Sequence, residues 1–457
     1  MDSQLNKKIV LIVTTLGAFI TPFMASAVNV ALPSISKEFM LSPVILNWIA
    51  LSFSLATALF ILPFGRLADI IGRKRLLIWG MSAFSIASSL CGISFNPAML
   101  IIARALQGVS AATISVTVVS ILTSVYSPGE RGRVLGLNVT ATYTGLSMGP
   151  FLGGFLTKYM GWRSLFLIVV PIGVIIVILL FKLKGEWAEA KDEKFDYVGS
   201  VIYAVTLLGI IGGLSLIHSP LGLVLIVIGA ISIVIFGILE SKIKEPILDM
   251  ALIRGSKVLT MSSLAALINY SATFAISYLL SLYLQYIKGF DSAQAGVILI
   301  AQPVVMALFS PIAGRLSDKI EPQKVASIGM ALTTVGLGFF TLLSKDTSII
   351  YIISGLMILG FGFALFSSPN TNAVMSSVEK KYYGVASGIL GAARNVGQSL
   401  SMGIASFTLA FYMGNEQFTT GNNPNFIIAV KVTFAILTLL CFMGIFASIA
   451  RGKVNRK

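Results

Sequence analysis

The sequence predicts an all-α integral membrane protein built from many membrane-spanning helices. Of its 457 residues, 56% are hydrophobic and 11% are charged, whereas a soluble domain carries about 25% charged residues. Apolar runs recur along the chain, and each approaches the roughly 20 residues that a helix needs to cross a bilayer. These runs do not alternate polar and apolar residues, as the strands of a membrane β-barrel would. Residues 174–180, for example, are apolar throughout.

Fourteen apolar segments are expected to cross the membrane. The first follows the polar residues 1–8, is too long for the apolar region of a signal peptide, and is expected to stay uncleaved. The even number places both termini on one side. The expected spans lie at about 9–32, 45–65, 75–95, 98–122, 135–157, 164–182, 197–217, 221–239, 258–284, 293–314, 324–343, 348–370, 383–411 and 426–449.

The positive charge predicts the orientation of these spans. The net charge is +15, but it is spread over short connections, so nucleic acid is not an expected partner. The connections on one side carry roughly four times as many cations as those on the other, which marks the first side and both termini as cytoplasmic. The wealth of Lys and Ile favours the plasma membrane of a prokaryote.

A short repeat predicts the domain organisation. The sequence Gly-Arg-Leu-x-Asp follows the second span at 65–69 and the tenth span at 314–318. Spans 1–6 therefore should match spans 9–14, with spans 7 and 8 inserted. Two parallel six-span halves are a known transporter plan, with the substrate site between the halves near mid-membrane. The expected domains are an N-terminal six-helix bundle at 1–185, an inserted helix pair with linkers at 186–257, and a C-terminal six-helix bundle at 258–457.

The stretch 65–75 is a candidate conformational latch. Its glycines allow helices to approach closely, and Asp69 can accept hydrogen bonds from a helix N-terminus or pair with a nearby arginine. The alternative is a basic loop that only fixes the topology. The latch candidates are Gly65, Arg66, Asp69, Gly72, Arg73 and Arg75, with Gly314 and Asp318 in the second half.

Arg104 lies inside the fourth span, close to Gln107 and Gly108. A charge within the bilayer is costly and by default marks a functional or paired site. The alternative is that Arg104, a few residues from the span's outer end, extends its side chain to the interface.

The fifth span carries a regular series of glycines. Gly145, Gly149 and Gly153 recur every four residues and form one smooth face for close helix packing. Gly154 adjoins this face, and Pro150 removes a backbone donor and bends the helix. The pattern predicts a pivot or a tight seal; without motion it is ordinary small-residue packing.

Polar and aromatic residues in several spans are candidates for lining a substrate cavity. At this depth such residues either face a cavity or tie helices together. The candidates are Asn29, Trp48, Tyr143, Tyr270, Asn370, Asn372, Arg394, Asn395 and Gln398.

Together these stretches resemble a known family. Residues 65–75, 100–108 and 145–154 are similar to motifs A, B and C of the major facilitator superfamily, and 28–33 and 367–398 to its fourteen-span drug:proton antiporter branch. The resemblance implies alternating access and export of small amphipathic molecules from the cytoplasm in exchange for protons. It also implies that Asp69 helps to hold the outward-open state and that Arg104, with Gln107, Gly108 and Asp69, participates in coupling.

One position departs from that branch. Met24 stands where the branch carries an acidic residue in the first span, and all 18 acids fall in loops or near span ends. Proton carriage normally needs a titratable group in the transport path. Coupling would then use Asp69 or Glu38 with Arg104. Alternatively, the protein is an exporter, uniporter or flippase for an anionic or zwitterionic metabolite or lipid, with weak or no proton coupling, which Arg104 and Arg394 would suit.

Other classes of function find little support in the sequence. It contains no phosphate-binding loop, nucleophile motif or metal-ligand cluster, which argues against an enzyme, an ATP-driven pump, a cofactor or a bound metal. Cys91 and Cys441 lie in separate apolar runs and are expected to pack as small apolar residues. His218 precedes a turn and is expected at the membrane interface. We expect a monomer.

Overall fold

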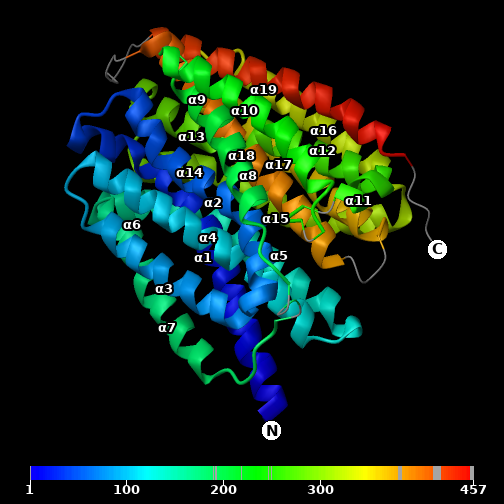
Figure 1. Cartoon of the computed structure of the whole chain (residues 1–457). Helices are drawn as coiled ribbons and strands as arrows, with labels where there is room; N and C mark the ends of the chain where they lie inside the picture. The colour runs from blue at the N-terminus through cyan, green and yellow to red at the C-terminus, as the bar shows by residue number, and fades with distance from the viewer. Residues whose placement is uncertain are drawn as a thin grey trace.

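The computed structural model is a bundle of long helices with no β-strand among the residues that it describes. Figure 1 shows the first half of the chain, in blue to teal, below the second half, in green to red. We call the end of the bundle where the first helix begins and the last helix ends the terminal end, and the other the distal end. The described residues are 2–188, 190, 193–217, 219–244, 246–248, 250–378, 383–414 and 424–452.

The all-α membrane architecture that the sequence predicts is confirmed. Eleven helices among the described residues are long and apolar enough to cross a bilayer. Three further long helices, at Pro128–Met160, Pro322–Phe340 and Tyr383–Met413, fall outside this set. The chain is therefore a multi-pass helical membrane protein, and the number of fourteen spans stays a prediction.

The first half forms one helical bundle. Helix α1 packs against α5, α2 against α4, and α3 against both α4 and α7. Several of these helices begin with proline after a residue with extended backbone, as Pro97 does after Asn96, whose side chain accepts from Met99 N at 2.8 Å. The helices are α1 (Asp2–Phe39), α2 (Pro43–Ile71), α3 (Arg73–Gly92), α4 (Pro97–Val125), α5 (Pro128–Met160), α6 (Arg163–Leu167) and α7 (Val169–Lys182).

Two helices and a short third segment follow before the second half. Helix α8 continues into α9 through a π-helical turn, η1, and the pair packs against α10 where the backbones of Gly209 and Gly229 meet. This inserted pair contacts α2 of the first half and α18 of the second. The elements are α8 (Tyr197–Leu207), η1 (Leu208–Gly212), α9 (Gly213–Ser215), α10 (Pro220–Glu240) and α11 (Met250–Gly255).

The second half repeats the packing of the first. Helix α12 packs against α18, α15 against α17, and α16 against both α17 and α19, which matches the pairs of the first half in order. This repetition supports the predicted domain boundaries at 185 and 257, which stay a prediction. The elements are α12 (Lys257–Thr273), α13 (Ile276–Leu282), η2 (Tyr283–Ile287), α14 (Ser292–Leu299), α15 (Ala301–Lys319), α16 (Pro322–Phe340), α17 (Ile349–Ser376), α18 (Tyr383–Met413) and α19 (Pro424–Ala450).

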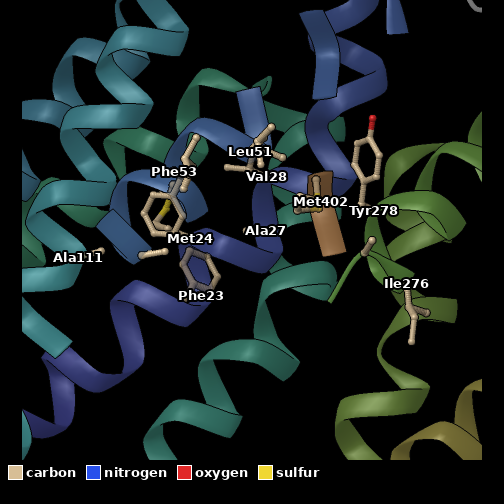
Figure 2. Packing of buried hydrophobic residues seen from close by; sticks show 14 of the residues in the cluster. Phe23, Met24, Ala27, Val28, Leu51, Phe53, Ala111, Ile276, Tyr278 and Met402 are labelled. Atoms are coloured by element: carbon tan, nitrogen blue, oxygen red, sulfur yellow. The ribbon is translucent and has the colours of Figure 1, made fainter. Parts of the chain in front are cut away.

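The two halves meet along two seams. Helix α2 packs against α18, and α5 packs against α14 and α15. A continuous cluster of buried hydrophobic residues joins the halves at the distal side of the bundle, and Figure 2 shows Ala27, Val28 and Leu51 of the first half beside Met402 and Tyr278 of the second. The seams leave space between the halves toward the terminal end, where the candidate site lies.

Candidate transport cavity and its two ends

A cavity of about 1960 Å³ lies between the two halves. Helices α1, α2, α4 and α5 of the first half and α12, α15, α17 and α18 of the second contribute to its wall. Its lining extends to residues at the terminal end, among them Asp69, Ser124 and Arg254, and no lining residue comes from the distal connections. The cavity therefore opens toward one end of the bundle only.

The predicted cavity residues fall into two groups. Six of them line the cavity: Tyr143, Tyr270, Asn370, Arg394, Asn395 and Gln398. The Tyr143 hydroxyl and Ser367 Oγ lie 2.8 Å apart and form a hydrogen bond between α5 and α17, hence between the halves. The Tyr270 ring lies edge-on to Phe363, with 5.3 Å between ring centroids. These contacts build a wall that is partly aromatic and partly polar.

The other three predicted cavity residues lie away from the lining. Asn29 is buried in α1 and Trp48 is half-buried in α2. Asn372 donates from Nδ2 to Ser317 Oγ of α15 at 2.9 Å, whereas Asn370, two residues earlier, faces the cavity and donates to Ser262 O at 3.2 Å. Residues two apart on a helix point to different faces, so a polar cluster in sequence divides between the cavity and the helix contacts.

Arg394 is the deepest charged residue of the described lining. It lies about three turns into α18, whereas the other charged lining residues stand near the terminal end. Met24, in the place of the first-span acid, is fully buried and does not line the cavity. Figure 2 shows it in the apolar core with Phe23, Phe53 and Ala111. No described carboxylate therefore stands opposite Arg394 in the deep part of the lining.

Arg104 is buried behind the cavity wall. The residue is 1% exposed. The guanidinium donates to Ile49 O at 3.1 Å and to Gln107 Oε1 at 2.5 Å, and it lies 4.3 Å from the centroid of the Phe53 ring. Gln107 in turn donates to Ser88 Oγ at 2.7 Å. The charge is thus held by neutral acceptors and an aromatic face, rather than extended to the interface or paired with a described carboxylate.

Phe53 separates that arginine from the cavity. Its ring covers Arg104 while the residue also lines the cavity. The backbone fits tightly here, because a Cβ on Gly108 would overlap Phe53 O. Any group that binds against Phe53 therefore lies one aromatic ring away from a buried positive charge.

The candidate latch forms a local network at the terminal end. Arg73 donates from Nε and Nη2 to Asp69 Oδ1 at 2.9 and 2.7 Å, and from Nη1 to Ser120 O at 3.3 Å and to Ser124 Oγ. The pair thus joins the end of α2 to the end of α4. Gly72, between them, has a positive φ of 110°, which favours glycine.

The linker after α7 folds back over this turn, and we call its described residues, 183–188, 190 and 193–196, the strap. Glu186 accepts at Oε1 from Lys74 N at 2.8 Å and at Oε2 from Arg75 N at 3.0 Å, so its carboxylate caps the first turn of α3. A Cβ on Gly72 would lie against this carboxylate. The positive φ and the contact with Glu186 together explain why this turn carries glycine.

Further strap residues bind the same turn through backbone and charge. Arg73 N donates to Trp187 O at 2.8 Å, and Ala190 N donates to Asp69 O at 3.0 Å. Arg66 forms an ion pair with Glu193. The strap is therefore the described partner of the latch in this conformation, which sequence reasoning missed. The high charge of this linker was visible, but its pairing depends on the fold.

The second-half counterpart is less elaborate among the described residues. Gly314 and Asp318 lie on α15, and a Cβ on Gly314 would approach Ser368 Oγ of α17 at 2.9 Å. Gly65, by contrast, lines the cavity, and a Cβ there would meet only Val116, at 4.0 Å. The side chain of Asp318 and the whole of His218 lie outside the described residues.

The distal end is closed by contacts between backbones. The glycine face of α5 packs on α1, where a Cβ on Gly145 would overlap Phe19 O and one on Gly149 would overlap Ser26. A Cβ on Gly153 would lie 3.0 Å from Ala27. The predicted glycine series is thus a tight contact surface in this structure.

The same helix seals against the second half. A Cβ on Gly154 would overlap Ser292 O of α14, and one on Gly296 would overlap Pro150 O. Ser292 Oγ donates to Gly154 O at 3.1 Å. At the rim Lys158 pairs with Asp291 at 3.0 Å. The backbone N–H of Gln294, followed by Lys158, lowers the pKa of Asp291 below its usual value.

Comparison with known proteins identifies the family. The model of the "Major Facilitator Superfamily" matches residues 14–402 and, in a second match, 262–455. With two similarly packed halves around a cavity, the chain belongs to this superfamily of membrane transporters, as the sequence motifs predict. Members bind small-molecule substrates, often with proton coupling.

Individual relatives cover nearly the whole chain. The riboflavin transporter RibZ of Clostridioides difficile is 29% identical over 451 residues, 97% of each protein. The multidrug resistance protein Stp of Mycobacterium tuberculosis is 29% identical over 412 residues, which are 88% of this chain and 76% of Stp. Among solved structures, a bacterial homologue of the human lysosomal transporter Spinster, in an inward-facing and unoccupied conformation, has a TM-score of 0.70 at 16% identity and covers 98% of this chain and 97% of its own.

Proposed function

We propose that this protein is a secondary transporter that exports small amphipathic molecules by alternating access, in exchange for protons. The observation that carries the proposal is the cavity between the two halves, open at one end and sealed at the other. A transporter of this plan needs such a cavity in each of two states, open first to one side and then to the other.

The charge distribution supports a cytoplasmic opening. The terminal end carries the excess of cations, including Arg66, Arg73 and Arg254 beside the cavity, and cation-rich loops are retained in the cytoplasm. On this assignment both termini are cytoplasmic and the cavity loads from the cytoplasm of a bacterial cell. The protein would then lie in the plasma membrane, as a monomer surrounded by lipid.

The cavity wall supports a preference among amphipathic substrates. Tyr143, Tyr270 and Phe363 offer aromatic surfaces, and Asn395 and Gln398 offer hydrogen bonds beside Arg394. A half-buried cation in the cavity wall, with no described carboxylate at its depth, attracts anions and repels cations. We therefore propose neutral or anionic aromatic molecules as the preferred cargo. A relative that carries riboflavin, a neutral aromatic molecule, fits this proposal.

The same feature supports one alternative. A transporter for an anionic or zwitterionic metabolite or lipid, without proton exchange, would also use Arg394 and need no acid in the first span. The two functions differ in whether cargo and protons move together.

The test uses the full-length protein in proteoliposomes with an imposed pH gradient. Three probes are compared: riboflavin, the anion carboxyfluorescein and the lipophilic cation ethidium, while the internal pH is recorded. We expect riboflavin or carboxyfluorescein, and not ethidium, to move protons in the opposite direction. Cargo movement with no pH response would replace antiport by the alternative, and transport of ethidium alone would refute the proposed preference.

The variant Arg394→Gln sharpens the test of preference. It keeps a polar side chain, although a shorter one, and removes the positive charge. We expect carboxyfluorescein transport to fall at least tenfold, with riboflavin much less affected. Equal loss for both probes would assign Arg394 a structural role instead.

A further inference from the structure

Two acidic side chains meet where the inserted helices reach the cavity. Asp196 precedes the first residue of α8, and Glu240 is the last residue of α10. Glu240 lines the cavity, although the residue as a whole is only 2% exposed. One oxygen of each carboxyl is satisfied by a backbone N–H: Asp196 Oδ1 accepts from Gly199 at 2.8 Å, and Glu240 Oε2 accepts from Leu248 at 2.9 Å.

The remaining two oxygens face each other. Asp196 Oδ2 and Glu240 Oε1 are both buried and have no hydrogen-bond partner. Both also lie against the same point, because a Cβ added to Gly199 would overlap each of them. Two ionised carboxylates can only accept hydrogen bonds, so they would leave these oxygens unpaired and repelling. A single proton between them makes one group a donor to the other and removes both problems.

Among the described residues, no ion pair compensates a second negative charge at this site. Neither carboxyl forms an ion pair with a described residue. Arg66 pairs with Glu193, Asp69 with Arg73, and the Tyr203 hydroxyl donates to Ala58 O. The remaining described ionisable groups on neighbouring segments are Lys194, Tyr197, Lys242, Lys244 and Arg254. Glu189, Lys191, Asp192, Glu245 and Asp249 lie outside the described residues.

We propose that Asp196 and Glu240 together form a proton-binding site of the transporter. It would supply the titratable group that Met24 leaves missing from the first span, and it rests on the proposed proton antiport. In its protonated state the pair shares one proton. When that proton is released to water in the cavity, both groups become carboxylates. Two carboxyls sharing a site always differ in their affinity for the first and second proton.

The position of the pair links this proton to the latch. Asp196 ends the strap, whose earlier residues hold Asp69, Arg73 and the start of α3. Loss of the shared proton sets two like charges against each other across the α8–α10 contact. The resulting repulsion acts on the strap, and through it on the turn between α2 and α3.

The substitution Glu240→Gln imitates the protonated state. The Gln amide oxygen can accept from Leu248 N, while its NH₂ group donates to Asp196 Oδ2, so the contact is retained without a titratable proton. Asp196→Asn likewise keeps a good N-cap for α8. Both variants are therefore expected to fold, and a native melting temperature checks this. Asp346→Asn, at an exposed acid in a distal connection, is the matched control.

The experiment is a pH titration of the full-length protein in lipid by infrared difference spectroscopy, which records the carbonyl stretch of protonated carboxyl groups without any cargo. We expect the wild type and Asp346→Asn to show a carboxyl that titrates at a pH well above that of free aspartate or glutamate. We expect that signal to disappear in Glu240→Gln and to move or disappear in Asp196→Asn. An unchanged signal in both variants, or no such signal in the wild type, would overturn the proposal.

Transport in the same proteoliposomes keeps the two proposals apart. If the pair couples protons, Glu240→Gln should retain exchange of riboflavin across the membrane. The stimulation of riboflavin transport by a pH gradient should fall at least tenfold. A titrating pair in a protein that moves no protons with its cargo would leave the site standing and refute antiport. Proton-driven transport that survives both substitutions would support antiport and refute the acidic pair as its proton site.

Discussion

The two ends of the molecule are closed and opened by different physical means. At the distal end, α5 meets α1 and α14 through glycines whose backbones touch, so the seal depends on shape. At the terminal end, α2, α3 and α4 are joined by charged side chains and by the strap, beside an open cavity. Close packing at glycines is disrupted by larger side chains, whereas a network of charged side chains responds to protonation and to neighbouring charges. The difference indicates where each kind of perturbation should act.

The largest effect is expected from breaking the distal seal. Gly149→Leu places a large side chain where even a Cβ overlaps Ser26, which should cost about 1–3 kcal/mol of stability through overpacking and abolish transport. The measurement is riboflavin or carboxyfluorescein flux together with the melting temperature. Gly338→Leu on α16 is the control, because nothing lies within 4 Å of a Cβ there. Full activity of Gly149→Leu would show that the seal is loose.

Arg104→Ala should be nearly as damaging, because Arg104 joins α2 and α4 directly behind the cavity wall. The change leaves Gln107 Oε1 without its described donor and removes one of the donors to Ile49 O, and a buried group left unpaired costs about 1–3 kcal/mol. We expect transport to be lost while the protein still reaches the membrane. Arg104→Lys should rescue it poorly, since lysine lacks the planar fork that binds both acceptors. Normal flux in Arg104→Ala would remove Arg104 from the coupling assignment, and normal flux in Arg104→Lys would show that the charge alone is sufficient.

Asp69→Asn is expected to slow transport with little effect on folding. The amide oxygen can still accept from Arg73, but the charge that completes the pair is lost. We expect a reduction of about tenfold in flux and a melting temperature close to that of the wild type. The same change in a Glu186→Gln background tests whether strap and latch act together, because effects that simply add would mean that they act independently.

The smallest effect is expected at the rim of the distal end. The pKa of Asp291 is lowered in the folded protein by Gln294 N–H and Lys158, so its contribution to stability is present above the pKa of the unfolded chain, about 3.9, and is lost as the pH falls through the lower folded value. Asp291→Asn should therefore lower the melting temperature slightly at neutral pH and not at pH values near 2. A larger loss in acid would contradict this sign.

The sequence predicts the architecture well because hydrophobic length and the twin Gly-Arg-Leu-x-Asp stretches are local signals. The close-packing role of the α5 glycines is also predictable, because a four-residue spacing places them on one helix face whatever the partner is. The same rule explains why Asn372 faces α15 while Asn370 lines the cavity. Contacts between distant segments, such as the strap on the latch, carry no local signal.

The acidic pair illustrates this limit most clearly. Asp196 and Glu240 are 44 positions apart, each in a highly charged connection where ionised surface residues are the ordinary expectation. Only the packing of α8 against α10 turns them into facing, buried groups. The sequence shows that Met24 replaces the acid of the first span, but it gives no sign that Asp196 and Glu240 are buried together.

The most direct test of the account measures both ends in one sample. Spin labels are placed in pairs at Tyr159 and Val297 across the distal end and at Leu137 and Val385 across the terminal end, with Cys91 and Cys441 replaced by alanine. Pulsed electron resonance then gives each distance in lipid as the pH is changed and riboflavin is added. The account predicts that one pair shortens whenever the other lengthens. A protein that transports while the distal pair keeps a single short distance would contradict it.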